Sequence, residues 1–266
     1  MRGIVPLCTK LDHVGTLTRT VGDAHLVLAA AAGLDLQCTE ARFAPSTDSG
    51  AIATGDLRGL RLGVIRNFEA EETDPDMTKG FEEALSRLQQ IGASVTKLEL
   101  SGYDAARARR AAFVLLEVGA AQNHGDRFLK EPQCFSAEMR GFLTWGAKAS
   151  ALQLLKAEGV IDHAVRALAR CWESVDAIVS PSTPQAAFPF SQTVPENQGG
   201  FSALANLAGC PAIGVPMGLN KRSLPQGLQI FAPAHDERRE LRIALAFERE
   251  VALYLVPPPP YGPMSS

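Results

Sequence analysis

Hydrophobic and polar positions along the chain follow two periods, and together these periods predict strands that alternate with helices. Apolar runs bounded by turn residues predict strands at 61–66, 94–100, 176–180, 212–217 and 227–231. Helical periodicity predicts helices at 21–32, 75–91, 201–208 and 236–253, and long helical segments within 104–173. This alternation is typical of an α/β layered fold with a largely buried sheet.

Local signals at the ends of these elements indicate how some of them connect. Asp74 and Pro75 are a helix N-cap and a first helical residue, and the segment reads as strand, helix, strand. That order predicts a parallel pair joined by a crossover helix. The turn at 221–225 predicts a hairpin between the last two strands. Residues 1–19, 41–59 and 182–200 are rich in turn formers, and we expect them to be irregular.

The predicted helix at 21–32 is unusual because alanine and leucine cover most of its sides. Thr20 is its expected N-cap and Gly33 its expected C-cap. A helix that is apolar nearly all round is normally buried on every side. We therefore expect other parts of the structure to cover it.

Length and composition suit one globular unit. The chain has 266 residues, of which 46% are hydrophobic, and it is long enough to bury a core without disulfide or metal staples. We predict a single α/β domain over residues 1–256, followed by a proline-rich tail at 257–266.

Charge and cysteine content exclude several classes of function. Lysine and arginine number 26 against 29 acidic residues, so the net charge of −3 predicts neither a nucleic-acid partner nor an anionic membrane partner. The longest apolar stretch, at 26–34, is too short to span a bilayer. Five cysteines without a C-x-x-C pair argue against a disulfide framework and a zinc ribbon. We expect a reducing, cytoplasmic location.

A search for general catalytic motifs finds two candidates and favours neither. Ser94 and Lys97 match the S-x-x-K pattern of serine acylases, but in an alternating strand residues three apart point to opposite faces. Cys210 is either a nucleophile with a distant histidine or, as we favour, a buried small hydrophobic residue. The five histidines lack metal-ligand spacing, so no metal site is predicted.

Three separated segments resemble the amidase signature family, in the family's order and at similar separations. They are residues 3–7 with 11–15 and 18–24, then 176–184, and finally 206–218 with 224–230. The resemblance extends from Met1 to about Glu250. It implies a partial amidase-signature fold, a mixed β-sheet flanked by helices.

The resemblance also implies a reaction. Members of the family hydrolyse or transfer the acyl group of carboxamides, acting on the C–N bond. A serine attacks the carbonyl, a second serine with a cis peptide relays a proton, and a neutral lysine is the base. Backbone amides of a Gly/Ser-rich loop hold the oxyanion. The family uses no metal or organic cofactor.

This sequence departs from the family pattern because those catalytic parts lie upstream of the segment that matches Gly3. The resemblance therefore assigns no catalytic residue to this chain, and whether the chain by itself is an enzyme is left open. We expect it to be the C-terminal part of an amidase, inactive alone, that supplies strands and one wall of the substrate cleft. Met1 corresponds to a position in the middle of family sequences, so we expect it to be an internal methionine.

Several residues are candidates for the substrate pocket. Ser182 and Thr183 follow a strand end, where α/β sheets place ligands, although turn formation beside two prolines is the alternative we favour slightly. Phe201 and Cys210 are further candidates for the acyl pocket, with core packing as the alternative that we favour for each.

Two charged residues match positions beside the family's catalytic core. We expect Asp12 and Arg19 to support it by pairing with backbone groups or with each other, and an ordinary ion pair is an equal alternative.

One position bears on the substrate. Glutaminase subunits of transamidating enzymes typically carry an aspartate a few residues before the Asn-Leu-Ala/Thr-Gly segment, and it holds the glutamine ammonium group. The matching position here is about Gly199, and Glu196 is the one carboxylate nearby in the sequence. This difference favours a general amidase of unspecified small-molecule amide over a glutaminase subunit.

Three hypotheses for function follow. The chain is part of an amidase completed by another portion, or a non-catalytic binding module that kept the fold, or an unrelated hydrolase using Cys210 or Ser94. A sheet interrupted near its centre leaves an unpaired strand edge and an exposed apolar face. The first hypothesis therefore predicts a partner, in a homo- or hetero-oligomer, that covers this edge. It also predicts that the missing portion supplies much of the cover of the apolar helix at 21–32.

Overall fold

The structure is a computed structural model that describes residues 3–33, 52 and 56–253. The predicted proline-rich tail at 257–266 and most of the predicted loop at 41–59 lie outside the described residues.

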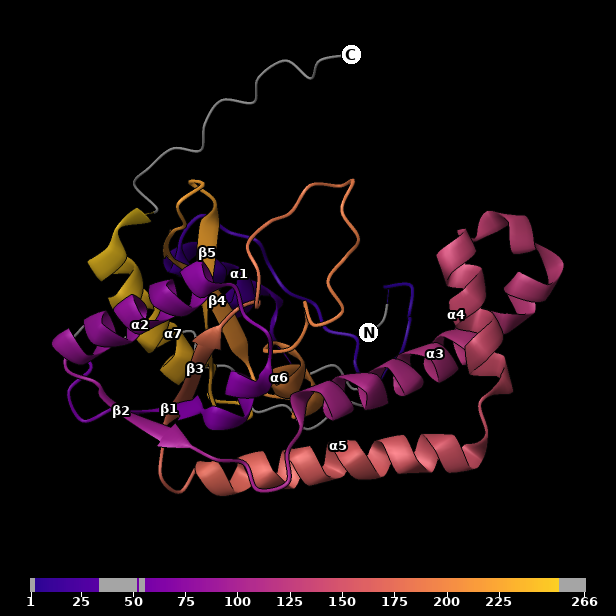
Figure 1. The fold of residues 1–266 in the computed structure, drawn as a ribbon, viewed down its shortest axis with the longest axis horizontal. Helices are drawn as coiled ribbons and strands as arrows, with labels where there is room; N and C mark the ends of the chain where they lie inside the picture. The colour runs from indigo at the N-terminus through magenta and orange to yellow at the C-terminus, as the bar shows by residue number, and fades with distance from the viewer. Residues whose placement is uncertain (1–2, 34–51, 53–55, 254–266) are drawn as a thin grey trace, which may run out of the picture.

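One mixed sheet organises the described part of the chain (Figure 1). Its five strands are β1 (Arg61–Ile65), β2 (Ser94–Leu98), β3 (Ala177–Pro181), β4 (Ala212–Leu219) and β5 (Pro225–Phe231). Their spatial order is β2-β1-β3-β5-β4. Strands β2, β1 and β3 are parallel, whereas β5 is antiparallel to both β3 and β4. The predicted parallel pair, terminal hairpin and mixed sheet are confirmed.

Helices lie on both faces of the sheet. One face carries α1 (Val21–Ala31), α2 (Pro75–Gln90) and α7 (Glu237–Val251), and the other carries α3 (Ala105–Lys130), α5 (Ala151–Cys171) and α6 (Ala203–Leu207). Helix α4 (Ala137–Lys148) packs on α3 where that helix extends beyond the sheet (Figure 1). Two short 3-10 helices, η2 (Arg66–Ala70) and η3 (Pro132–Cys134), complete the described elements.

Strand β3 joins the two layers of the core. All five of its residues are buried, because β1 and β5 flank it and helices cover both faces. Successive side chains of a strand point to opposite faces. Ala177 and Val179 therefore pack with α2 and α7, while Ile178 packs with α5 and α6.

Helix α1 differs from its prediction. The Thr20 side chain caps it as expected, by accepting a hydrogen bond from the Asp23 amide, but Ala32 rather than Gly33 is the C-cap. Val21 is its one buried residue, and Leu26 is 67% exposed. The expectation that this helix is buried nearly all round is wrong for the described residues, because α2 and α7 already cover the sheet and α1 lies outside them against α7.

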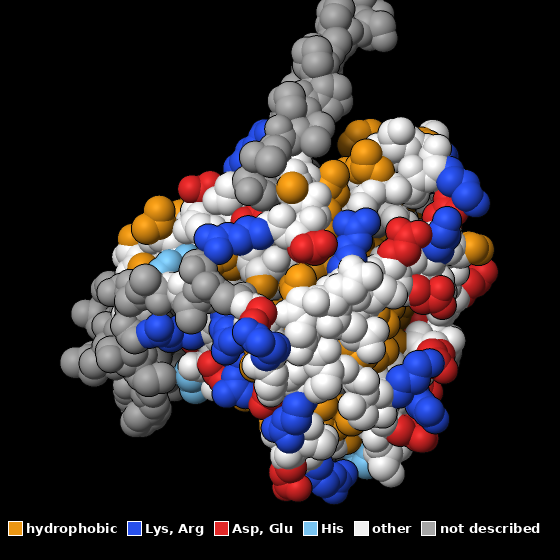
Figure 2. All heavy atoms as spheres, turned by 90° about the vertical axis from the view of Figure 1, so that its left-hand side faces the viewer, with side chains coloured by type: hydrophobic (Ala, Val, Ile, Leu, Met, Phe, Trp, Pro, Cys, Tyr) orange, Lys and Arg blue, Asp and Glu red, His pale blue; other side chains and the backbone are white. Residues whose placement is uncertain are grey.

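Surface charge is mixed on the face shown in Figure 2. Basic and acidic side chains are interspersed there, and apolar side chains lie between them. This distribution agrees with the near-neutral net charge.

Helices α3 and α4 approach each other closely at one glycine. A Cβ atom at Gly146 would overlap the backbone carbonyl of Glu117 in α3, whereas a Cβ atom at Gly141 on α4 would meet nothing within 4 Å. The lack of a side chain at Gly146 is therefore what allows the two helices to pack.

We predict that Gly146→Ala lowers the free energy of unfolding by about 1–3 kcal/mol, because the added methyl group forces α4 away from α3. The matched control Gly141→Ala should instead raise it by about 1 kcal/mol through its higher helix propensity. Urea unfolding of both variants measures this. Equal effects of the two substitutions would contradict the packing argument.

Candidate functional site

A cavity of about 550 Å³ lies at the carboxyl ends of the parallel strands β1 and β3. We call it the strand-end cavity. Strand β1 ends at Ile65, and the chain then turns through η2 into α2, which leaves the space open above the strand ends. Its apolar lining residues are Val64, Ile65, Phe68, Phe81, Leu85, Val179, Pro181 and Phe201. Its polar lining residues are Glu69, Glu71, Glu72, Thr73, Thr78, Glu82, Lys97 and Ser180.

Phe201, one of the predicted pocket residues, lines this cavity and is 2% exposed. Its ring packs edge-on against Phe68, with 5.1 Å between the ring centroids. The buried Gln229 side chain donates hydrogen bonds to the Phe201 carbonyl and to the Ser180 Oγ atom, each at 3.2 Å. The sheet thereby holds the backbone of Phe201 at the wall of the cavity.

A buried ion pair supports the same wall. The Arg109 Nη1 atom lies 3.2 Å from a carboxylate oxygen of Glu71, and both side chains are largely buried. The Glu71 carboxylate also lies against Gly200, where an added Cβ atom would be 2.7 Å from Glu71 Oε2. A side chain at position 200 would therefore have to displace this paired carboxylate.

Glu71 is a residue of this wall that no sequence pattern indicated. Glu196 is the one carboxylate near Gly199 in the sequence, whereas the fold brings Glu71 to the neighbouring Gly200 from a segment far away in the chain. No local motif marks Glu71, because it follows the short helix η2 in an irregular connection. Its place beside Gly200 could be found only from tertiary structure.

The other predicted pocket residues in the same loop make local contacts. The Ser182 amide donates a hydrogen bond to the Gly227 carbonyl at 2.8 Å, which extends the β3–β5 ladder. The Thr183 hydroxyl donates to the Gln185 carbonyl at 2.6 Å, as in a turn. Neither Ser182 nor Thr183 is among the residues that line the strand-end cavity.

Cys210 is half-buried beside the core layer that contains α6. Burial, and to a smaller extent the nearby Glu240 carboxyl, raises the pKa of the Cys210 thiol to about 11. A thiol with this pKa stays protonated at neutral pH, and the thiolate is the nucleophilic form. This environment favours the packing role of Cys210.

The S-x-x-K match has the geometry of a strand. Ser94 and Lys97 both lie in β2, and the Ser94 hydroxyl donates to the Leu60 carbonyl at 3.2 Å. The Lys97 ammonium group is 2.9 Å from a Glu69 carboxylate oxygen. Each side chain is engaged elsewhere, so this pair forms no catalytic dyad.

Asp12 organises the backbone near the beginning of the described chain. Its carboxylate accepts hydrogen bonds from the amides of Leu7 at 2.9 Å and Cys8 at 3.1 Å. Arg19 is exposed and directly precedes Thr20, the N-cap of α1.

A side-chain contact joins the first and third family-like segments. The Asn206 amide group in α6 donates to the Leu11 carbonyl at 3.0 Å and lies 3.1 Å from His13 Nδ1. Residues almost two hundred positions apart therefore meet here. This contact ties the 3–19 segment to the sheet face that α6 covers.

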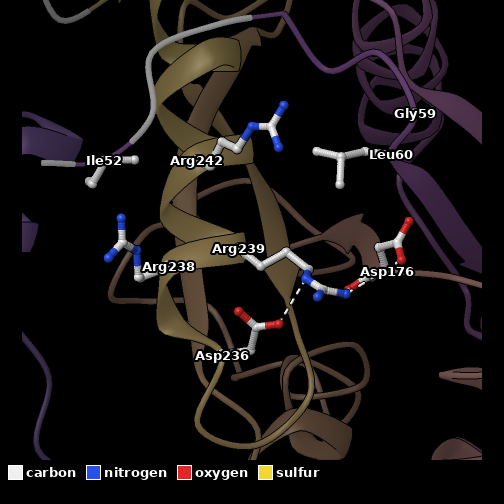
Figure 3. Close-up of a pocket in the computed structure, with 8 residues that line it drawn as sticks. All are labelled: Ile52, Gly59, Leu60, Asp176, Asp236, Arg238, Arg239 and Arg242. Atoms are coloured by element: carbon white, nitrogen blue, oxygen red, sulfur yellow. Dashed lines mark hydrogen bonds and ion pairs between the residues drawn. The ribbon is translucent and has the colours of Figure 1, made fainter. Parts of the chain in front are cut away.

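A second cavity, of about 330 Å³, lies at the opposite end of β1 and β3 (Figure 3). Asp176 lies there between Arg61, at 3.0 Å, and Arg239, at 3.4 Å, and Arg239 also pairs with Asp236 at 2.8 Å. The hydrogen bond from Arg61 keeps the pKa of the Asp176 carboxyl below its usual value. These charges pair with one another and connect α7 to the amino ends of the strands.

A metal site is not formed by the described residues, which contain no group of three or more His, Cys, Asp or Glu side chains placed to hold an ion. None of the described helices has the length and apolar character needed to cross a membrane.

The fold defines a mixed α/β protein with a cavity at the strand ends, which is where open α/β sheets commonly bind ligands. The chain belongs to the amidase family, whose family model matches residues 1–241. The predicted resemblance is confirmed.

Named relatives agree with this assignment. The chain is 32% identical to the A subunit of glutamyl-tRNA(Gln) amidotransferase from Myxococcus xanthus, over 93% of this chain and 57% of that protein. It is 30% identical to 2-amino-5-chloromuconic acid deaminase of Comamonas testosteroni, over 93% of this chain and 53% of that protein. The structure of a bacterial aryl acylamidase superposes with a TM-score of 0.78 at 18% identity, over 90% of this chain and 54% of that one. The chain thus spans about half the length of these relatives.

The ion pairs of Asp176 make stability depend on pH. The pKa of this carboxyl is lowered in the folded state, so its stabilisation is complete above the unfolded pKa of about 3.9 and is lost as the pH falls through the folded value. We predict that Asp176→Asn costs about 2 kcal/mol at pH 7 and that this difference shrinks at acidic pH. Urea unfolding at several pH values measures it. The exposed Asp162→Asn is the control, and a pH-independent cost would contradict the prediction.

Proposed function

We propose that this chain is the C-terminal part of an amidase-signature amidohydrolase that acts on carboxamide C–N bonds, and that it hydrolyses no amide by itself. The observation that carries the proposal is the family match over residues 1–241, in a chain that spans only 53% to 58% of its relatives' length. The chemistry that the resemblance implies needs a lysine and two serines upstream of Gly3. The engaged Ser94 and Lys97 and the protonated Cys210 thiol described above agree with this interpretation.

The outer edge of β4, with which no described strand pairs, supports completion by another portion of the fold. Gly227 uses its carbonyl on the β3 side, where it accepts the Ser182 amide. Residues of an antiparallel pair alternate between facing the partner and facing away, so Pro216, opposite Gly227, turns its backbone groups to the free side. Gly214 and Ala212 do the same by alternation. No described strand pairs with their amides and carbonyls, so a further strand can do so, although Pro216 offers only its carbonyl.

Exposed apolar side chains support the same completion. Val5 is 80% exposed, Val14 68%, Leu17 104% and Leu26 of α1 67%. Exposed apolar surface of this kind marks an interaction site when it is contiguous. We propose that the complementary portion of the amidase fold covers these side chains and buries α1, the helix for which the sequence predicted cover.

A glutaminase subunit is the second candidate function, and the named similarity to the amidotransferase A subunit favours it. The absence of a carboxylate at Gly199 argues against it, because the nearby Glu71 is already paired with Arg109. We therefore propose a small-molecule carboxamide as the substrate. A non-catalytic binding module is the alternative that keeps the fold without the chemistry.

We predict that the purified chain releases no ammonia from benzamide or L-glutamine above the buffer rate. Joined to the N-terminal portion of an amidase-signature relative that carries the lysine and both serines, it should hydrolyse at least one of a panel of aryl and alkyl carboxamides. The control is the same complex with the nucleophilic serine of the added portion changed to alanine. Turnover by the chain alone would overturn the proposal, and a monodisperse monomer that gains no activity would favour the binding module.

We also predict that Leu26→Lys weakens capture of the complementary portion and reduces self-association of the isolated chain, because it places a charge on the surface that the partner buries. Leu155→Lys is the matched control, since Leu155 is 62% exposed on α5. Sedimentation velocity and co-purification measure both effects. Equal effects of the two substitutions would show that α1 is not part of the interface.

A further inference from the structure

We propose that the strand-end cavity binds an organic cation, namely an ammonium group attached to an aryl or branched alkyl group. This inference goes beyond the proposed function, because binding requires neither the missing catalytic residues nor hydrolysis.

The volume and lining of the cavity fit the apolar part of such a ligand. At about 550 Å³ the cavity falls within the size range of small-molecule sites, about 300–1,000 Å³. Phe68 and Phe201 form an edge-on aromatic pair in its lining, and Phe81 and Leu85 of α2 line it from the other face of the sheet. Most of these side chains are fixed by the core, so the cavity is preformed.

The charged residues that line the cavity determine which sign of charge a ligand should carry. Lys97 is neutralised by Glu69 at 2.9 Å, and Glu71 by Arg109 at 3.2 Å. Two lining carboxylates remain, those of Glu72 and Glu82, and neither side chain has an ion-pair partner among the described residues. The lining therefore keeps an excess of negative charge beside apolar walls.

This combination selects a cation over the other ligand classes. An anion would meet two unpaired carboxylates, and like charges brought together are disfavoured. A neutral apolar molecule would gain the contacts with the walls but not the attraction to Glu72 and Glu82. An aryl ammonium ion gains both, and cations are also attracted to aromatic faces.

The test compares three probes of similar shape, benzylammonium, benzyl alcohol and benzoate, by titration calorimetry at low ionic strength. It uses the purified chain, or its complex with the complementary portion if the isolated chain self-associates. We expect benzylammonium to bind about tenfold more tightly than benzoate, a difference of about 1.4 kcal/mol, with benzyl alcohol between them. Benzoate binding as tightly as benzylammonium, or no binding of benzylammonium, would overturn the proposal.

Variants locate the site. Combined Glu72→Gln and Glu82→Gln should weaken benzylammonium binding about tenfold and leave benzyl alcohol unchanged. The matched control is Glu83→Gln, because Glu83 neighbours Glu82 on α2 but does not line the cavity. Equal losses from the control and the double variant would show general charge attraction instead of this site. Binding and hydrolysis are measured separately. An inactive complex that still binds benzylammonium would contradict the proposed amidase function but would support the proposed cation site.

Discussion

The burial of β3 on every side is the constraint on which the rest of this structure depends. Parallel pairing with β1 and antiparallel pairing with β5 satisfy its backbone, and helices on both faces cover its side chains. Because both of its ends are held, the strand places Ser180 and Pro181 at one cavity and Asp176 beside the other. A displacement of β3 would therefore alter both ends of the sheet together.

The two edges of the sheet differ, and this difference supports completion of the fold by another portion. At one side β2 is a short edge strand with a charged surface, where Lys97 pairs with Glu69. At the other side β4 has backbone groups with which no described strand pairs, and α1 offers an apolar surface that the described residues leave exposed. In a chain about half as long as its relatives, such a surface fits a fold that continues in another portion.

Electrostatics at the strand-end cavity separate structural charges from those that remain available to a ligand. The Glu71–Arg109 pair is buried, and its carboxylate lies against Gly200. Removing one member of a buried pair leaves an uncompensated charge, so such pairs are difficult to exchange singly. The carboxylates of Glu72 and Glu82 lie where solvent reaches them and have no such structural contact.

Local chemistry in the sequence determined the strands and most helices, because capping, periodicity and turn formers act over a few residues. The family followed from the resemblance of three separated segments to the amidase signature. The Asp74–Pro75 start of α2 and the β4–β5 hairpin are examples. How much of α1 this chain itself covers could not be predicted, since apolar composition indicates a need for cover but not which part of the fold supplies it. Tertiary structure alone decided that Glu71 meets Gly200 and that Phe68, Phe81 and Phe201 surround one cavity. Such contacts depend on how the sheet arranges distant segments in space, and the spacing of residues along the chain does not determine which distant segments meet.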